Sequence, residues 1–294
     1  MQPEIEVGVV GLGNMGGGIA RNLARAGHAA AGWDTAEAAR ARVAGELPLA
    51  APEEMAAAGA TIFFVVPASP DIEAGLGPLL AGAADGATIY DLTTSYPDDT
   101  RRLAERATAG GVPYLDAGMS GGASGADAGT LTLMVGGDRT AFERTRHFLD
   151  AIAADVFHLG DSGAGHTMKL VHNMVCHTVF LATCEGGRLC ERAGLRLEDM
   201  IAVFNVSNAR SYASEFRFPA HILSGSWDAR SRIHNLGKDL EMAMRLAEAS
   251  GADTACSGAT YRFLQAALGL GMSEDDFSLL YRDFERIRER RDAE

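Results

Sequence analysis

The chain has 294 residues, 47% hydrophobic and 22% charged, which suits one or two globular domains with a sizeable core. The formal net charge of −13 argues against nucleic-acid binding, although local basic side chains or backbone N–H groups could still hold an anionic substrate. No stretch reaches the ~18 apolar residues needed to cross a bilayer. The first four residues, Met-Gln-Pro-Glu, carry a negative charge and lack the basic start of a signal peptide, so we expect a cytoplasmic protein without membrane contact.

Four cysteines lack Cys-x-x-Cys spacing, and three of them fall in one apolar helical stretch. They are Cys176, Cys184, Cys190 and Cys256. This pattern predicts reduced thiols that lie mostly in the core.

The first half of the chain alternates short apolar runs with helical stretches. A helix is predicted over about 15–26, with Gly27 at its C-terminal end, and another runs to about residue 44, capped by Thr35. Strands are predicted at 5–10, 29–33, 61–66, 88–92, 114–117, 130–135 and 155–159. The alternation predicts βαβ units and a parallel sheet.

Beyond Leu159 the patterns are helical and no convincing strand occurs. Helices are predicted over about 166–193, 197–205, 233–250, 258–268 and 275–290. We therefore predict an α/β Rossmann domain over residues 1–162 and an all-helical domain over 163–294. The first and longest of these helices would join the two domains and be buried between them.

A G-x-G-x-x-G motif directly follows the first predicted strand and opens a helix. It reads Gly11-Leu12-Gly13-Asn14-Met15-Gly16. Its glycines allow a tight turn, close approach of a pyrophosphate and close helix–strand packing, and the helix N-terminus attracts negative charge. This context favours a dinucleotide site over an unliganded glycine-rich turn.

Asp34 ends the second predicted strand at the spacing expected of a ribose-binding carboxylate. Its charge would repel a 2′-phosphate, which favours NAD over NADP, with NADP as the alternative. Asp34 could instead cap the following helix. Arg40 and Arg42 could bind a phosphate, although helical arginines are more often solvated.

Four segments, taken in order, resemble those of the β-hydroxyacid dehydrogenase family, which includes 3-hydroxyisobutyrate dehydrogenase and tartronate semialdehyde reductase. They are the glycine motif at 11–16, Asp-Ala-Gly-Met-Ser-Gly-Gly at 116–122, Gly-Ala-Gly-His-Thr-Met-Lys at 163–169 and Lys-Asp-Leu at 238–240. The resemblance covers nearly the whole chain. It implies two domains with the active site in the cleft between them, and a homodimer or homotetramer.

The resemblance also implies roles for particular residues. The segment that contains Ser120, Gly121 and Gly122 is similar to the family's substrate-binding segment, and the one that ends at Lys169 is similar to its catalytic lysine segment. Lys238 belongs to a second cofactor-contacting segment. The residues that would line the nicotinamide side of the cofactor pocket are Val66, Pro67 and Thr94, with Thr93 and Ser95 beside the last.

Lys169 and Asn173 are four residues apart on a proline-free stretch and so share one helix face. Oxidation of an alcohol by NAD⁺ requires removal of the hydroxyl proton, and desolvation lowers the pKa of a lysine enough for this work. Asn173 would orient the substrate and Lys169. A lone lysine on an apolar helix could otherwise extend its ammonium group into water.

The remaining polar residues admit two interpretations each. Ser120, Gly121 and Gly122 would hold a carboxylate through a hydroxyl and backbone N–H groups, or form a flexible loop. Lys238 would contact cofactor or substrate, and Asp239 would hold Lys238 or cap its helix.

Two sets of residues outside these motifs also have alternative roles. His172, Cys176 and His177 could converge on a metal, although core or interface histidines are commoner and no fourth ligand is evident. Arg210 and Arg217 could clamp a second anionic group of a substrate, or be solvated or salt-bridged.

The favoured function is NAD-dependent interconversion of a small β-hydroxy acid, similar to 3-hydroxyisobutyrate, and its semialdehyde or keto form. A reductase of an aldehyde acid such as tartronate semialdehyde is the alternative. An imine reductase would usually lack Lys169, and a decarboxylating enzyme of the 6-phosphogluconate type would have a longer helical domain. A non-catalytic NAD sensor would not need the set of Ser120, Lys169 and Asn173.

Overall fold

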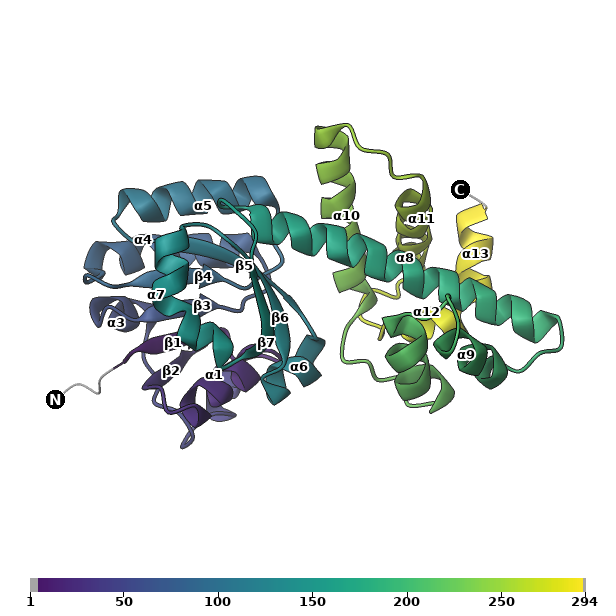
Figure 1. The fold of residues 1–294 in the computed structure, drawn as a ribbon, viewed down its shortest axis with the longest axis horizontal. Coiled ribbons are helices and arrows are strands. Elements are labelled where there is room, and N and C mark those ends of the chain that lie inside the picture. Colours follow the sequence, from purple (N-terminus) through teal and green to yellow (C-terminus); the bar gives the residue numbers. More distant parts are fainter. Residues whose placement is uncertain (1–4, 293–294) are drawn as a thin grey trace. The chain divides into compact units, whose positions relative to one another are not determined.

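The computed structural model describes residues 5–292, so the acidic start at 1–4 lies outside it. The chain forms two compact units, Met1–Lys169 and Leu170–Glu294. The division falls inside helix α8 (Ala164–Arg192), after its first turn and a half (Figure 1). The boundary predicted between residues 162 and 163 lies in the turn just before this helix.

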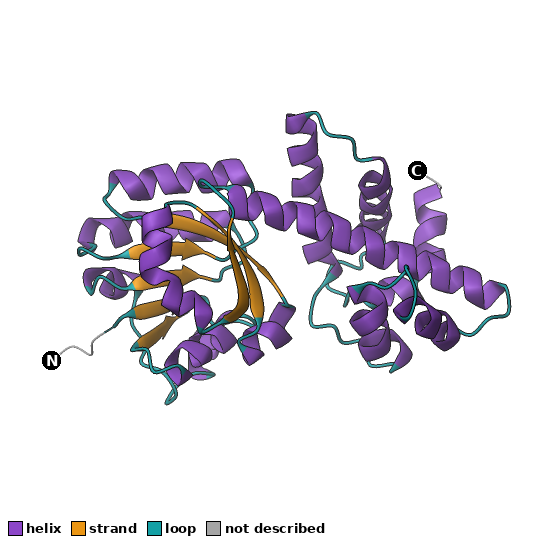
Figure 2. Ribbon diagram, in the orientation of Figure 1, coloured by secondary structure: helices purple, strands orange, loops and turns teal. Residues whose placement is uncertain are grey.

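A seven-stranded sheet in the order β2-β1-β3-β4-β5-β6-β7 forms the first unit (Figure 2). All seven strands occur where the apolar runs predict them. They are β1 (Val7–Val10), β2 (Ala30–Trp33), β3 (Thr61–Phe64), β4 (Thr88–Asp91), β5 (Tyr114–Ser120), β6 (Leu131–Gly136) and β7 (Ala153–His158). The chain order reverses at β1, where β2 lies on one side and β3 on the other, and ligands of such sheets bind at the carboxyl ends of these strands.

One strand pair departs from the predicted parallel arrangement. Strand β6 runs antiparallel to β5, with Asp116 opposite Gly136 and Ser120 opposite Thr132. Residues 121–130, which include the short helix α6 (Gly122–Ala128), join the two strands. A parallel crossover needs a dozen or more residues, so this connection is too short for one.

Helices cover both faces of the sheet because alternate side chains of each strand point to opposite faces. Phe63 packs into a cluster with α1 (Gly16–Arg25) and α7 (Arg139–Asp150). Its neighbours Ile62 and Phe64 pack into a second cluster. The helices of that second cluster are α3 (Pro52–Ala57), α4 (Ser69–Gly82) and α5 (Pro97–Ala109).

The second predicted helix is shorter than expected, and Thr35 does not cap it. Helix α2 spans Glu37–Ala41, and Ala36 precedes its first turn. The Ala36 N–H donates to the Asp34 carboxylate at 2.8 Å in a turn just before the helix, and no side chain caps α2 itself. Gly27, with φ +90°, follows α1 as predicted.

Helices and the loops that join them make up the second unit, and residues 170–292 contain no strand. Besides most of α8 it contains α9 (Leu197–Asn205), a π-helical segment η1 (Ala213–Leu223), α10 (Ile233–Ser250), α11 (Ala255–Gly269), α12 (Leu279–Arg282) and α13 (Phe284–Asp292). The single helix predicted over 275–290 is wrong. The Asp276 carboxylate accepts the backbone N–H groups of Ala229 and Ser278, which holds this part of the chain in a turn.

The four cysteines are all free, but fewer are buried than predicted. Cys184 is buried, Cys176 and Cys190 are partly buried, and Cys256 is exposed. Within residues 5–292, no helix combines the length and the apolar character that a membrane crossing requires.

Candidate active site

The glycine motif forms the turn between β1 and α1, and its three glycines have different surroundings. A side chain at Gly11, where φ is +98°, would overlap the Val65 carbonyl oxygen, and one at Gly16 would overlap the carbonyl of Gly11. A side chain at Gly13 would meet no protein atom within 4 Å. The fold itself therefore does not require glycine at this position, whereas close approach of a pyrophosphate does.

The other three residues of the motif differ in how far they are exposed to solvent. Leu12 is buried beneath β2, so only its backbone can face a ligand, whereas Asn14 is exposed and Met15 is partly exposed. These residues fit a dinucleotide whose phosphates meet the backbone at the start of α1.

Asp34 links the end of β2 to the glycine turn. Its Oδ2 accepts the Leu12 N–H at 2.7 Å, while Oδ1 accepts the Ala36 N–H. A carboxylate has about four acceptor positions, so capacity remains for ribose hydroxyls. Arg40 donates to the carbonyl oxygens of Asp34 and Thr35 at 2.5 and 3.0 Å, which places a cation beside the predicted ribose site.

The predicted nicotinamide-side residues follow the carboxyl ends of β3 and β4. Pro67 is exposed, and Val66 and Thr94 are partly exposed, so a ligand can reach all three. The neighbours of Thr94 are buried instead: the Thr93 N–H donates to Asp91 at 2.9 Å and the Ser95 hydroxyl at 3.4 Å. Burial raises the pKa of Asp91.

Asp116 anchors the first turn of α8. Its two carboxylate oxygens accept the N–H groups of Gly163 at 2.7 Å and His166 at 2.8 Å, at the helix end where a negative charge is favourable. The His166 ring is fully buried, with Nδ1 at 2.7 Å from the Thr100 hydroxyl, and Nε2 donates to the Asp91 carbonyl oxygen at 3.2 Å. Sequence reasoning missed the roles of Asp116, His166 and Thr100.

Lys169 lies one turn further along α8 and is only 9% exposed. Its stem packs on β5 at Gly118, where an added Cβ would lie 2.5 Å from the Lys169 Cβ. Asp116, Gly118 and Ser120 alternate along β5 and so share one face of this strand. The sequence motifs at 116–122 and 163–169 therefore meet within the first unit.

Ser120 ends β5 partly exposed, and the two glycines after it are exposed. Gly121 and Gly122 adopt φ of +122° and +62°, which only glycine adopts readily. This segment leads directly into α6.

Asn173 belongs to the second unit, and its amide is held on both sides. Its Nδ2 donates to the Asp239 carboxylate on α10 at 2.6 Å, and its Oδ1 accepts from His172 Nδ1 at 2.9 Å. Sequence reasoning missed this role of Asp239. Lys238 precedes it and is partly buried.

The arrangement of His172, Cys176 and His177 does not support the metal alternative. In the part of the chain that the structure describes, no three His, Cys, Asp or Glu side chains lie together as metal ligands would. His172 is engaged with Asn173, and His177 is buried along α8.

A glycine turn after β1 and a carboxylate at the end of β2 are typical of dinucleotide-dependent oxidoreductases of the Rossmann type. Two family models agree with this class: the NAD binding domain of 6-phosphogluconate dehydrogenase matches residues 6–160, and the NAD-binding domain of NADP-dependent 3-hydroxyisobutyrate dehydrogenase matches residues 163–284.

Known proteins are similar over nearly their whole length. A 2-(hydroxymethyl)glutarate dehydrogenase of Eubacterium barkeri is 30% identical, over 98% of this chain and 97% of that protein. An NAD-dependent L-serine dehydrogenase of Pseudomonas aeruginosa is 31% identical, over 95% and 98%. The structure of a 3-hydroxyisobutyrate dehydrogenase of Mycobacterium tuberculosis with L-serine matches with a TM-score of 0.86 and 28% identity, over 95% of this chain and 99% of that one. The chain belongs to the β-hydroxyacid dehydrogenase family and is an NAD(P)-dependent dehydrogenase.

Proposed function

We propose that this enzyme interconverts a small β-hydroxy acid, HOCH₂–CH(R)–COO⁻, and its semialdehyde. The three relatives are named for 3-hydroxyisobutyrate, L-serine and 2-(hydroxymethyl)glutarate, and all three compounds contain this unit. They differ only in R, so the shared unit is the part that a common mechanism would recognise. We assign cofactor binding and the substrate contacts of Ser120, Gly121 and Gly122 to residues 1–162, and the other substrate contacts and dimerisation to 163–294.

The observation that carries the proposal is the buried Lys169 stem on the β5 face that also bears Ser120. In alcohol oxidation the Lys169 Nζ accepts the hydroxyl proton, and in the reverse direction it returns that proton to the alkoxide oxygen. When bound, the nicotinamide cofactor accepts or supplies the hydride.

The remaining assignments follow from hydrogen-bonding capacity. The Ser120 hydroxyl and the N–H groups of Gly121 and Gly122 bind the substrate carboxylate. Asn173, with its amide fixed by His172 and Asp239, still has an acceptor and a donor position with which to orient the substrate. Lys238, beside Asp239, contacts cofactor or substrate. Reduction of an aldehyde acid such as tartronate semialdehyde is the same reaction in reverse.

A panel of hydroxy acids, followed by NADH absorbance at 340 nm, tests the substrate class and Lys169 together. The Lys169→Ala variant should lose roughly 10²–10⁴-fold in kcat, the usual size of a general acid/base contribution. Cofactor affinity should change little, because the glycine turn and Asp34 are intact. Lys169→Arg should restore little activity, since a guanidinium stays protonated. Turnover of Lys169→Ala within a few-fold of the parent would refute the mechanism.

A further inference from the structure

Arg217 of η1 lies against three aromatic rings of the second unit. Its guanidinium carbon is 4.7 Å from the ring centroid of Phe277, 5.4 Å from that of Phe180 and 5.7 Å from that of Tyr212. These contacts hold the cation through the ring faces, but the rings accept no ordinary hydrogen bond from its five N–H donors.

The guanidinium has no carboxylate partner among residues 5–292, and its Nη1 is buried without a hydrogen-bond acceptor. The carboxylate nearest in sequence, Glu215, pairs at 3.5 Å with Arg210, which is largely exposed. Of the two arginines considered above as anion clamps, one is therefore neutralised and the other is not. A partly buried guanidinium in this state is prepared for an anion, which its planar fork binds through two parallel hydrogen bonds.

The position of Arg217 relates it to Asn173. Phe180, which Arg217 contacts, lies seven residues after Asn173 on α8, so the two share one buried face about 10 Å apart along the axis. Long side chains on a helix point back toward its N-terminus, which brings the Phe180 ring closer to Asn173. A five-carbon diacid measures roughly 7 Å end to end with bonds of about 1.5 Å, and a hydrogen bond at each end adds about 3 Å.

We infer that Arg217 binds a second carboxylate, at the far end of the R group, and that the preferred substrates are β-hydroxy diacids. This inference rests on the proposed function, because it takes Asn173 to mark the reactive end of the substrate. The contacts with Phe180 and Phe277 would hold the guanidinium in place before the diacid binds, which lowers the entropic cost of binding.

A substrate series with constant reactive unit tests this inference. The compounds are 3-hydroxyisobutyrate, 2-(hydroxymethyl)succinate, 2-(hydroxymethyl)glutarate and the 5-amide of the last, which has the same shape without the second charge. The unmodified enzyme should prefer a diacid to its amide and to the monoacid in kcat/KM. Hydrogen bonds to a charged partner contribute about 10- to 100-fold, so Arg217→Met should lower the diacid-to-monoacid ratio of kcat/KM by that factor.

Two further variants separate recognition from structure. Arg210→Met, a control on the same segment, should leave the diacid-to-monoacid ratio unchanged, and Arg217→Lys should restore part of it. An unchanged ratio in Arg217→Met, or an equal loss with both substrates, would overturn the inference and leave Arg217 as a structural brace.

Competition by unreactive acids gives a second measurement that needs no variant. Glutarate should bind the unmodified enzyme–NAD complex at least about tenfold more tightly than butyrate in calorimetry. Equal affinities would refute the diacid inference even if Arg217→Met failed to fold. Oxidation of the monoacid without any diacid preference would contradict this inference alone, whereas failure to oxidise every hydroxy acid would contradict the proposed function.

Discussion

Three residues of β5 contribute to the candidate site around Lys169, each in a different way. Asp116 holds the backbone of the helix that carries the lysine, and Gly118 leaves room for the lysine stem. Ser120, next on the same face, offers the hydroxyl that we assign to substrate binding. Because every second residue of a strand points to the same face, these three residues lie on one face of β5.

Asp34 should determine the cofactor preference. Its carboxylate already accepts two backbone N–H groups, so a 2′-phosphate would meet a full negative charge at short range. We predict a higher kcat/KM with NAD than with NADP, and a smaller difference in Asp34→Asn, which keeps an acceptor oxygen but loses the charge. Arg40 in the neighbourhood should assist NADP once the repulsion is gone. Equal use of both cofactors by the unmodified enzyme would contradict this.

Asp91 should make stability depend on pH. Burial raises its pKa in the folded state, while the His166 ring, the Tyr114 hydroxyl and the Thr93 N–H oppose the rise in part. A raised folded-state pKa means that folding takes up protons, so the contribution of Asp91 to stability is full below the ordinary carboxyl value near 4 and is lost as pH rises through the folded-state value.

Comparison with Asp91→Asn isolates this effect from other titrations. The free energy of unfolding of the unmodified protein should fall, relative to that of Asp91→Asn, as pH rises from about 4 to 8. Urea denaturation at several pH values measures the free energy of unfolding of each protein. A difference between the two proteins that stays constant over this range would show that Asp91 does not titrate in it.

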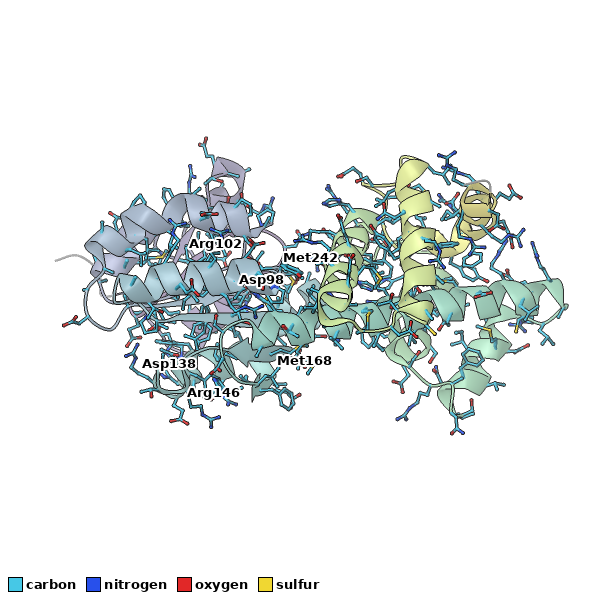
Figure 3. All side chains as sticks on the ribbon, turned by 90° about the horizontal axis from the view of Figure 1, so that it is seen from above. Asp98, Arg102, Asp138, Arg146, Met168 and Met242 are labelled. Carbon is cyan, nitrogen blue, oxygen red and sulfur yellow. The ribbon has the colours of Figure 1, made fainter. Side chains whose placement is uncertain are left out.

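At the scale of elements, the start of α8 is the segment whose anchoring should affect both stability and activity. Two backbone N–H groups, those of Gly163 just before the helix and of His166 in its first turn, depend on Asp116, so Asp116→Ala should lower the free energy of unfolding by about 2 kcal/mol. It should also lower kcat, because Lys169 lies on the next turn. Asp138, labelled in Figure 3, is the matched control: it caps α7 through one hydrogen bond to the Ala141 N–H at 2.7 Å.

The Asp138→Ala control separates the loss of a helix cap from a change in the position of Lys169. Asp138→Ala should cost about 1 kcal/mol of stability and leave kcat as it was. Denaturant titration and steady-state kinetics of both variants provide the comparison. If Asp116→Ala kept the parent kcat, anchoring of α8 would have no bearing on Lys169.

Local patterns predicted the elements well where side-chain periodicity decides them. The runs at 61–64 and 88–91 are apolar enough to identify buried strands, and the positions of Lys169 and Asn173 follow from helical spacing alone. What local patterns could not supply were partners distant in sequence: Asp116 with the start of α8, and Asn173 with Asp239, are 47 to 66 residues apart. The antiparallel β6 and the π-helical η1, which contains Pro219, likewise depend on connections and packing.

At the scale of the whole molecule, α8 carries apolar side chains that are exposed to solvent in the single chain. Its exposed apolar side chains include Val171, Val175 and Val179, at intervals of four residues, and Leu189 further along. The adjacent Met168 on the same helix is labelled in Figure 3 and is 43% exposed. Residues spaced by four form one stripe on a helix, and an apolar stripe of this kind is normally buried in a partner.

We therefore predict that the protein is an oligomer in which α8 contributes to the interface between copies. Light scattering at micromolar concentration should give at least twice the monomer mass of 30.9 kDa. Val175→Glu, which introduces a charge at a residue 53% exposed in the single chain, should shift the protein toward the monomer without unfolding it, because a buried unpaired charge is costly only at an interface. The same change at Leu49, exposed to 44% near β2, should leave the mass unaltered. A monomeric mass for the unmodified protein, or an unaltered mass for Val175→Glu, would contradict an interface at this helix.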